Sequence, residues 1–231
     1  MERKTMSTLV SIICFVIGLL IIYIWGSVAY RKTDYGKSHK EGLWKILTDD
    51  GALGEYKTSR QFEEVKYPHK IIYNCYIPKT NGETTEIDIV AITEKGIWVI
   101  ENKNYKGWIF GDAYSKKWCQ TLNKNKYFFY NPIWQNKTHI KYLSNILSSM
   151  PENYFKSIIV FNRATIKKVS LPDNNTYVFD MGQLRNFLKE PHLNLLSPEQ
   201  INAIYEKLLP YTNVSKEQKK THIDNINKKY K

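Results

Sequence analysis

Three residues in the middle of the chain have the types and spacing of a site that binds a metal ion and stabilises charge. Asp88 lies in the β-rich segment 85–92, and Glu101 and Lys103 lie in a second such segment, 97–103. The residues between the two segments are typical of a hairpin turn, so the segments are expected to pair as antiparallel strands. Two acids and a lysine would then share a small area of one sheet.

The register of this hairpin decides whether the two acids meet. A short loop pairs Ile92 with Ile97, and the same register sets Asp88 opposite Glu101, with Lys103 on the same face. Directly opposed Cβ atoms lie about 4.5–5.5 Å apart, a distance at which like charges destabilise a sheet. A bound divalent cation would offset that repulsion.

Oxygen atoms dominate the donor set, which favours a hard cation. The two carboxylates, the Asn102 carbonyl group and water would suit Mg²⁺, with Mn²⁺ as an alternative. A plainer interpretation is a surface salt-bridge ladder formed by Asp88, Glu101 and Lys103 on an antiparallel sheet. The spacing alone is compatible with both interpretations.

Further motifs surround these residues in a fixed order. They are Gly54-Glu55, Glu86-Ile87-Asp88, Val99-Ile100-Glu101-Asn102-Lys103, Gly107 and Trp118-x-Gln120. Together these motifs, within residues 48–162, resemble the nuclease-related domain family of the PD-(D/E)xK nuclease superfamily. The resemblance implies an α/β fold with a restriction-endonuclease-like core: a mixed central sheet with a catalytic β-hairpin, flanked by helices.

The resemblance also implies a metal-dependent phosphodiesterase acting on DNA or RNA, with Mg²⁺ as the cofactor. Asp88 and Glu101 correspond to the metal-binding acids. Lys103 corresponds to the lysine that positions or polarises the attacking water. Glu55 matches a helix acid that completes the metal shell or orients that lysine, so these four residues form the expected catalytic set.

A downstream helix is expected to supply substrate contacts. Asn131-Pro132-x-x-Gln135 matches a family motif whose glutamine points toward the site. The family tyrosine four residues further on is replaced by His139, which is still able to donate a hydrogen bond to a phosphate. Lys106 and Gln120 complete the expected substrate-binding set.

The composition favours a polyanionic partner. The 231 residues carry 34 Lys+Arg against 22 Asp+Glu, a formal net charge of +12, and their 42% hydrophobic content excludes a disordered tail protein. Residues 102–150 hold eight lysines and one acid, interleaved with aromatic residues. That mixture is typical of a nucleic-acid surface, although a solvated lysine face over an aromatic core is the plainer alternative.

The N-terminal segment is expected to cross a membrane. No charged residue lies between Lys4 and Arg31, and the apolar stretch 9–29 is long enough to span a lipid bilayer. A cleaved signal peptide is the alternative, because Ser27-Val28-Ala29 offers small residues at a suitable position. The denser cations after the helix place the larger part of this single-pass cell-membrane protein in the cytoplasm.

The expected organisation is therefore a domain on a membrane stalk. Residues 1–30 form the anchor, 31–47 a juxtamembrane linker, 48–162 the nuclease-related domain and 163–231 a C-terminal helical extension. Two other hypotheses stay open. One is a non-catalytic nucleic-acid-binding or scaffold module tethered to the membrane, and the other is a structural membrane protein whose basic face docks on lipid.

Overall fold

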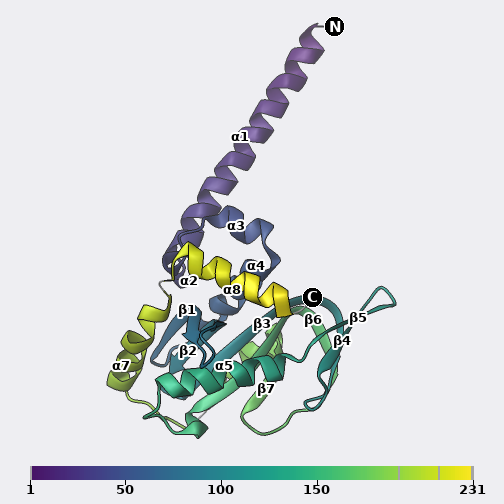
Figure 1. The fold of residues 1–231 in the computed structure, drawn as a ribbon. Coiled ribbons are helices and arrows are strands. Elements are labelled where there is room, and N and C mark those ends of the chain that lie inside the picture. Colours follow the sequence, from purple (N-terminus) through teal and green to yellow (C-terminus); the bar gives the residue numbers. More distant parts are fainter. Residues whose placement is uncertain (1, 192, 213, 230–231) are drawn as a thin grey trace.

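One mixed sheet forms the centre of the protein. Within residues 2–191, 193–212 and 214–229, which the computed structural model describes, seven strands join in this sheet. A long N-terminal helix projects from the α/β body that surrounds it (Figure 1). The strands are β1 (His69–Pro78), β2 (Thr84–Thr93), β3 (Gly96–Gly111), β4 (Lys117–Leu122), β5 (Asn125–Tyr130), β6 (Phe155–Val169) and β7 (Thr176–Asp180).

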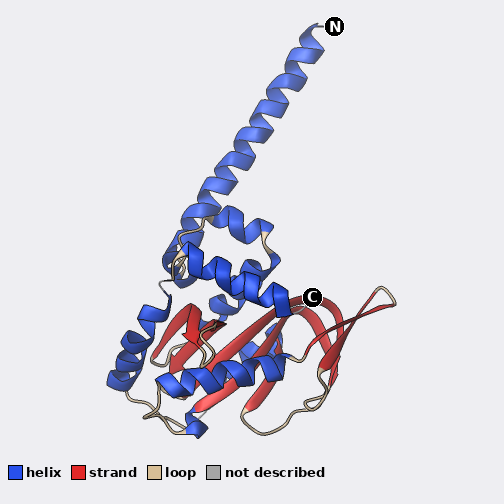
Figure 2. Ribbon diagram, viewed as in Figure 1, coloured by secondary structure: helices blue, strands red, loops and turns tan. Residues whose placement is uncertain are grey.

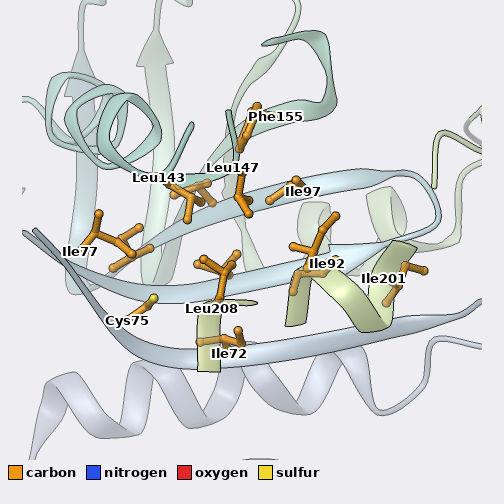
Figure 3. Packing of buried hydrophobic residues seen from close by; sticks show 14 of the residues in the cluster. Ile72, Cys75, Ile77, Ile92, Ile97, Leu143, Leu147, Phe155, Ile201 and Leu208 are labelled. Atoms are coloured by element: carbon orange, nitrogen blue, oxygen red, sulfur yellow. The ribbon is translucent and has the colours of Figure 1, made fainter. Parts of the chain in front are cut away.

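Helices lie on both faces of this sheet (Figure 2). They are α1 (Glu2–Lys32), α2 (Asp34–Ser38), α3 (Leu43–Thr48), α4 (Asp50–Phe62), α5 (Pro132–Ile146), α6 (Met181–Lys189), α7 (Pro198–Leu208) and α8 (Lys216–Lys229), with short 3₁₀ turns at Glu152–Tyr154 and Leu209–Thr212. Leu143 of α5 and Ile201 of α7 pack on one sheet face (Figure 3). Phe62 of α4 and Phe187 of α6 pack with Trp98 on the other face. This arrangement confirms the predicted α/β core.

The β2–β3 hairpin forms in the predicted register. Thr93 pairs with Gly96 and Ile92 pairs with Ile97. The Thr93 hydroxyl donates to the Gly96 carbonyl and accepts from the Lys95 N–H, both at 3.0 Å. Gly96 has φ +119°, a conformation that residues with a Cβ rarely adopt. Local chemistry therefore fixes the register of the two strands that carry the acids.

The central strand β3 changes neighbours along its length. Its pairing with β2 ends at Ile100 and its pairing with β4 begins at Trp108, while β6 runs parallel to it on the other edge. Beyond this point β2 continues beside β1 as far as Thr84. On the β2 side of β3, residues 101–107 thus have no strand partner within the described part of the chain. We call this opening the fork.

Helix α1 is apolar and exposed for most of its length, and its last turn packs on the body. Residues Met6–Lys32 are long and apolar enough to cross a membrane. Tyr30 is 2% exposed, and its ring centroid lies 5.7 Å from that of Tyr56 in α4. Arg31 donates hydrogen bonds to two carbonyl groups just after α2. The helix is therefore joined to the body through buried contacts.

Residues 31–47 differ from the polar linker that the sequence suggested. They contain α2 and most of α3, and Tyr35 and Ile46 are buried in the same core cluster as Tyr30. Trp44 and Leu47 are exposed, and the buried apolar contacts of the segment come from Tyr35 and Ile46. This segment therefore folds onto the domain.

Residues 163–231 also differ from a purely helical extension. Strand β6 continues to Val169, and β7 pairs with it in parallel from Ser157–Thr176 to Phe161–Asp180. Strand β5 was not predicted at all, because its residues include exposed polar ones and lack a clear alternation. The sheet is wider than local sequence patterns indicate.

Candidate active site

Asp88 takes the place of a strand partner at the fork. Its Oδ2 atom accepts a hydrogen bond from the backbone N–H of Asn102 at 2.7 Å. The recorded strand pairing stops one residue earlier, at Ile89–Ile100. The predicted Asp88–Glu101 pair is therefore not a regular rung of the ladder, and a side chain bridges the two strands where the backbones separate.

Glu101 is the most enclosed acid of this region, with 2% exposure. The Nζ atom of Lys103 donates to its Oε1 atom at 2.7 Å, and the Nε2 atom of His139 lies 3.1 Å from its Oε2 atom. A carboxylate so buried requires partners of this kind. Because Glu101 is buried, it is not part of a salt-bridge ladder on the protein surface.

Helix α5 brings Gln135 and His139 to the fork. Asn131 caps the helix, because its side-chain oxygen accepts a hydrogen bond from a first-turn N–H at 2.9 Å. Gln135 and His139 are four residues apart and share one helix face. The Oε1 atom of Gln135 accepts from Lys103 at 3.2 Å, so the glutamine contacts the lysine of the candidate site.

His139 is buried behind Glu101 and is 4% exposed. Its Nδ1 atom lies 2.8 Å from the Thr85 hydroxyl, and its Nε2 atom faces Glu101. If Thr85 donates to Nδ1, Nε2 carries the proton and donates to the carboxylate, which is the tautomer that stabilises an ionised Glu101. Both ring nitrogens are occupied inside the protein. The structure thus places His139 as a support for Glu101 instead of as an open phosphate contact.

Helix α4 carries Glu55 to the same region, and Gly54 permits its close approach. A Cβ atom at Gly54 would lie 3.0 Å from Asn162 Nδ2 and 3.2 Å from Asn104 Cβ. A larger residue would push α4 away from β3 and β6. The Gly54-Glu55 motif therefore combines a contact that needs a small residue with an acid that follows directly.

Tyr35, in α2, holds Glu55. Its hydroxyl donates to the Oε2 atom of Glu55 at 3.0 Å, and its own ring is 2% exposed. The ring stacks on His39 with centroids 3.8 Å apart. The segment that follows the N-terminal helix is thus in direct contact with an acid of the candidate site.

The acids perturb one another in different directions. Burial raises the pKa of Asp88 well above its usual range, and the charges of Glu101 and Glu55 raise it further. Burial also raises the pKa of Glu55 to about 7. Burial acts in the same direction on Glu101, but Lys103 and His139 outweigh it and lower the pKa of Glu101. The site therefore combines an ionised Glu101 with two carboxyl groups, Asp88 and Glu55, whose ionised forms are disfavoured.

The same acids keep Lys103 cationic. Burial acts to lower its pKa, but Glu101 and then Asp88 outweigh burial and raise that pKa above its usual value. An ammonium group has no lone pair with which to accept a proton. Lys103 is thus suited to donate hydrogen bonds and to supply positive charge, and unsuited to act as a general base.

The site residues and their order agree with a known family. Residues 50–162 match the sequence model of the nuclease-related domain. This chain carries a nuclease-related domain. The family belongs to the PD-(D/E)xK-like nuclease superfamily, and the matched residues include α4, the β2–β3 hairpin, α5 and the start of β6.

Similarity to a curated protein extends beyond this domain. An uncharacterized protein of Bacillus anthracis is 26% identical over 182 residues, which cover 78% of this chain and 85% of that protein. No solved structure matches the chain. The chemistry of the nuclease-related domain therefore has to be argued from its own residues.

A divalent cation at the fork would be held by the carboxylates of Asp88, Glu101 and Glu55. Within the described residues, no group of three or more His, Cys, Asp or Glu side chains is already arranged around one point. The carboxyl groups of Asp88, Glu101 and Glu55 are nevertheless close enough to repel one another. A hard cation among them would remove that repulsion and favour their ionised forms. The carbonyl group of Asn102 stays a predicted ligand.

The other two predicted substrate contacts lie further along the sheet. Gln120 in β4 donates from Nε2 to the backbone carbonyl of Lys106 at 2.8 Å, and the side chain of Lys106 is exposed. Within the described residues, no hydrogen bond joins either residue to the acids at the fork. Of the four residues predicted to bind substrate, Gln135 is thus the one that contacts Lys103.

Sequence reasoning missed three residues that support the site. Thr85 holds His139, Tyr35 holds Glu55, and Thr58 donates from its hydroxyl to Asn102 Oδ1 at 2.6 Å. Thr58 follows Glu55 by three residues, so helical spacing places both on one side of α4 and is a usable signal. Tyr35 has no comparable signal, because its contact depends on how α2 folds back onto α4.

Proposed function

We propose that this protein is a membrane-anchored, metal-dependent nuclease that hydrolyses phosphodiester bonds in DNA or RNA. The observation that carries the proposal is the convergence of Asp88, Glu101, Lys103 and Gln135 at the fork of a nuclease-related domain. These residues come from three separate elements, and their enclosed charges have no evident use in a purely structural surface.

Each side chain has a role in this chemistry. Asp88 and Glu101 would hold Mg²⁺, with Glu55 completing the shell or orienting its neighbours. Bound there, Mg²⁺ supplies positive charge to the phosphate and makes water a better nucleophile. Lys103, fixed by Glu101 and Gln135, orients the water and offsets the charge that develops on the phosphate. His139 keeps Glu101 oriented and ionised.

An exposed surface beside the fork supports a nucleic acid as the substrate. Trp108 of β3 and Phe128 of β5 are 52% and 66% exposed. Lys106, Lys124 and Lys126 are exposed on the same part of the sheet. Cations that neutralise phosphates and rings that stack on bases are the two features that bind nucleic acid without sequence preference.

Helix α1 is the proposed membrane anchor. We expect it to be retained in the mature protein, with the α/β body in the cytoplasm. Gly26 lies against Leu43, since a Cβ atom there would be 3.2 Å from Leu43 Cδ2. Tyr30 is buried in the body. Cleavage after Ala29 would remove the first of these contacts, which supports the intact helix. Full-length protein is expected to stay with membranes in alkaline carbonate, and a variant lacking residues 1–29 is expected to be released.

A cleavage assay tests the proposed activity. Full-length protein in nanodiscs is incubated with labelled single- and double-stranded DNA and RNA, in Mg²⁺ or in EDTA. We expect cleavage in Mg²⁺, none in EDTA, and a loss of about 10²-fold or more in Asp88→Asn. Asp173→Asn, which alters an exposed acid far along the chain, is the matched control. Binding without cleavage would replace the proposal with the non-catalytic module, and cleavage unaffected by Asp88→Asn would also contradict it.

A further inference from the structure

A second cavity lies apart from the fork, at the other end of the β2–β3 hairpin. Its volume is about 340 Å³, within the size range of small-molecule sites. Lys95, in the hairpin turn, lines it together with residues from the end of α4, the 64–67 loop and α6. Lys95 and Glu101 are separated by six positions of strand, which is roughly 20 Å at 3.3 Å per residue. The cavity is therefore distinct from the candidate active site.

Cations dominate the lining of this cavity. Lys66, Lys95, Arg185 and Lys189 contribute positive charge, and Glu64 is the acid among the lining residues. No ion pair within the described part of the chain involves any of these four cations. Like charges gathered around one cavity repel each other unless an anion lies between them. We call this site the basic cavity.

Lys95 is the cation whose position is hardest to explain without a ligand. Its side chain is 8% exposed, although its neighbours provide no carboxylate partner. Its Nζ atom donates to the carbonyl of Glu190 at 3.1 Å and lies 4.0 Å from the centre of the Tyr67 ring. Capping the end of α6 accounts for that one hydrogen bond. It does not account for the three other cations around the same space.

Two further features describe the ligand. The Tyr67 hydroxyl is itself buried, so Tyr67 meets the cavity through its ring. The Tyr67 ring, Val65 and Leu188 form an apolar wall. Arg185 donates a hydrogen bond from Nε to the side-chain oxygen of Gln61 at 3.0 Å. The remaining N–H groups of its planar guanidinium suit paired hydrogen bonds to a phosphate.

We propose that the basic cavity binds a small organic phosphate, with the phosphate group on Arg185 and the lysines and an apolar or aromatic part against the Tyr67 ring. A mononucleotide has both parts and the right size. This ligand goes beyond the proposed nuclease activity, because the cavity needs neither the acids at the fork nor a metal ion.

Calorimetric titration tests the proposal with adenosine 5′-monophosphate (AMP), adenosine and inorganic phosphate as probes. The full-length protein is held in zwitterionic nanodiscs with EDTA, so that a metal-loaded nuclease site cannot contribute. We expect saturable binding of a single AMP per chain, and binding weaker by about tenfold or more for adenosine, which lacks the charge-assisted hydrogen bonds. Absence of saturable binding of AMP and of phosphate would overturn the proposal.

Variants locate the bound nucleotide. Arg185→Gln and Lys189→Gln each remove an exposed cation that lines the basic cavity. Each is expected to weaken AMP binding by about fivefold or more. Lys207→Gln removes an exposed cation of α7 outside the cavity and is expected to have no effect. An equal effect of all three variants would contradict a specific site.

Two further outcomes would also overturn it. Loss of AMP binding in Asp88→Asn, with binding kept in Arg185→Gln, would place the nucleotide at the fork. Displacement of AMP when phosphatidylglycerol is added to the nanodiscs would assign the cavity to a lipid headgroup instead of a free ligand. Because the readout is binding in EDTA, it is independent of whether the protein cleaves nucleic acid.

Discussion

The Nε2 atom of His139 lies 3.1 Å from the Oε2 atom of Glu101, and both side chains are almost fully buried. The other oxygen of Glu101 accepts from Lys103. This arrangement orients the carboxylate from two sides and keeps it ionised.

Removal of that support is expected to affect stability and activity together. His139→Leu leaves one oxygen of a buried carboxylate without a donor, which costs about 1–3 kcal/mol of the free energy of unfolding. Cleavage should fall as well, since Glu101 is no longer oriented. His139→Gln keeps a donor and is expected to lose less on both measures. Denaturant unfolding and cleavage assays check this, and equal losses in the two variants would contradict the role.

Lys103 is expected to matter for activity more than for binding of nucleic acid. Lys103→Met keeps the length of the side chain and removes its charge, so cleavage should fall by about 10²- to 10³-fold while affinity for an oligonucleotide changes little. Lys207→Met, at an exposed position of α7, should leave both unchanged. Single-turnover cleavage and fluorescence anisotropy measure the two quantities. A loss confined to affinity would show that Lys103 only attracts the polyanion.

The hairpin and the start of α5 were predictable because they depend on local sequence. The four-residue turn 93–96 dictates the β2–β3 register, and Asn131-Pro132 dictates where α5 begins. The contact of Gln135 with Lys103 was implied by the family resemblance alone. The burial of Glu101 was not predictable in the same way. It depends on β6 and α5, which approach from distant parts of the chain.

The fork itself was also beyond local patterns. Pairing rules extend a hairpin rung by rung, so they placed Asp88 opposite Glu101 as one more pair. In the structure, β2 continues with β1 while β3 continues with β4 and β6. Pairing with these distant strands separates β2 from β3 at Asp88. The patterns within each strand do not indicate where this separation occurs.

Tyr35 provides a test of how the membrane-proximal segment acts on the site. Tyr35→Phe removes the hydrogen bond to Glu55 and should cost about 1 kcal/mol of stability. Cleavage should fall by about tenfold, because a displaced acid misplaces its neighbours. Tyr73→Phe is the matched control: its ring lies beside that of Tyr35, but its hydroxyl pairs with Ser59 at 2.5 Å and not with Glu55. Equal effects of the two variants on cleavage would contradict a positioning role for Tyr35.

The raised pKa values predict how metal binding depends on pH. Asp88 and Glu55 retain protons because burial and neighbouring acids raise their pKa, to about 7 for Glu55. A cation requires the ionised forms, so Mn²⁺ affinity should increase as the pH rises from about 5.5 to about 8, with release of protons. Calorimetry in two buffers of different ionisation enthalpy counts those protons. Glu55→Gln should release fewer, and pH-independent affinity would contradict the assignment.

The most direct test of the central claim is a titration of Mn²⁺ into the full-length protein, compared with Glu101→Gln. The claim is that Asp88 and Glu101 hold one divalent cation between them. We predict that the wild-type protein has a single tight site, that Glu101→Gln loses it, and that Glu206→Gln, which alters an exposed acid of α7, keeps it. An unchanged stoichiometry and affinity in Glu101→Gln would contradict the account.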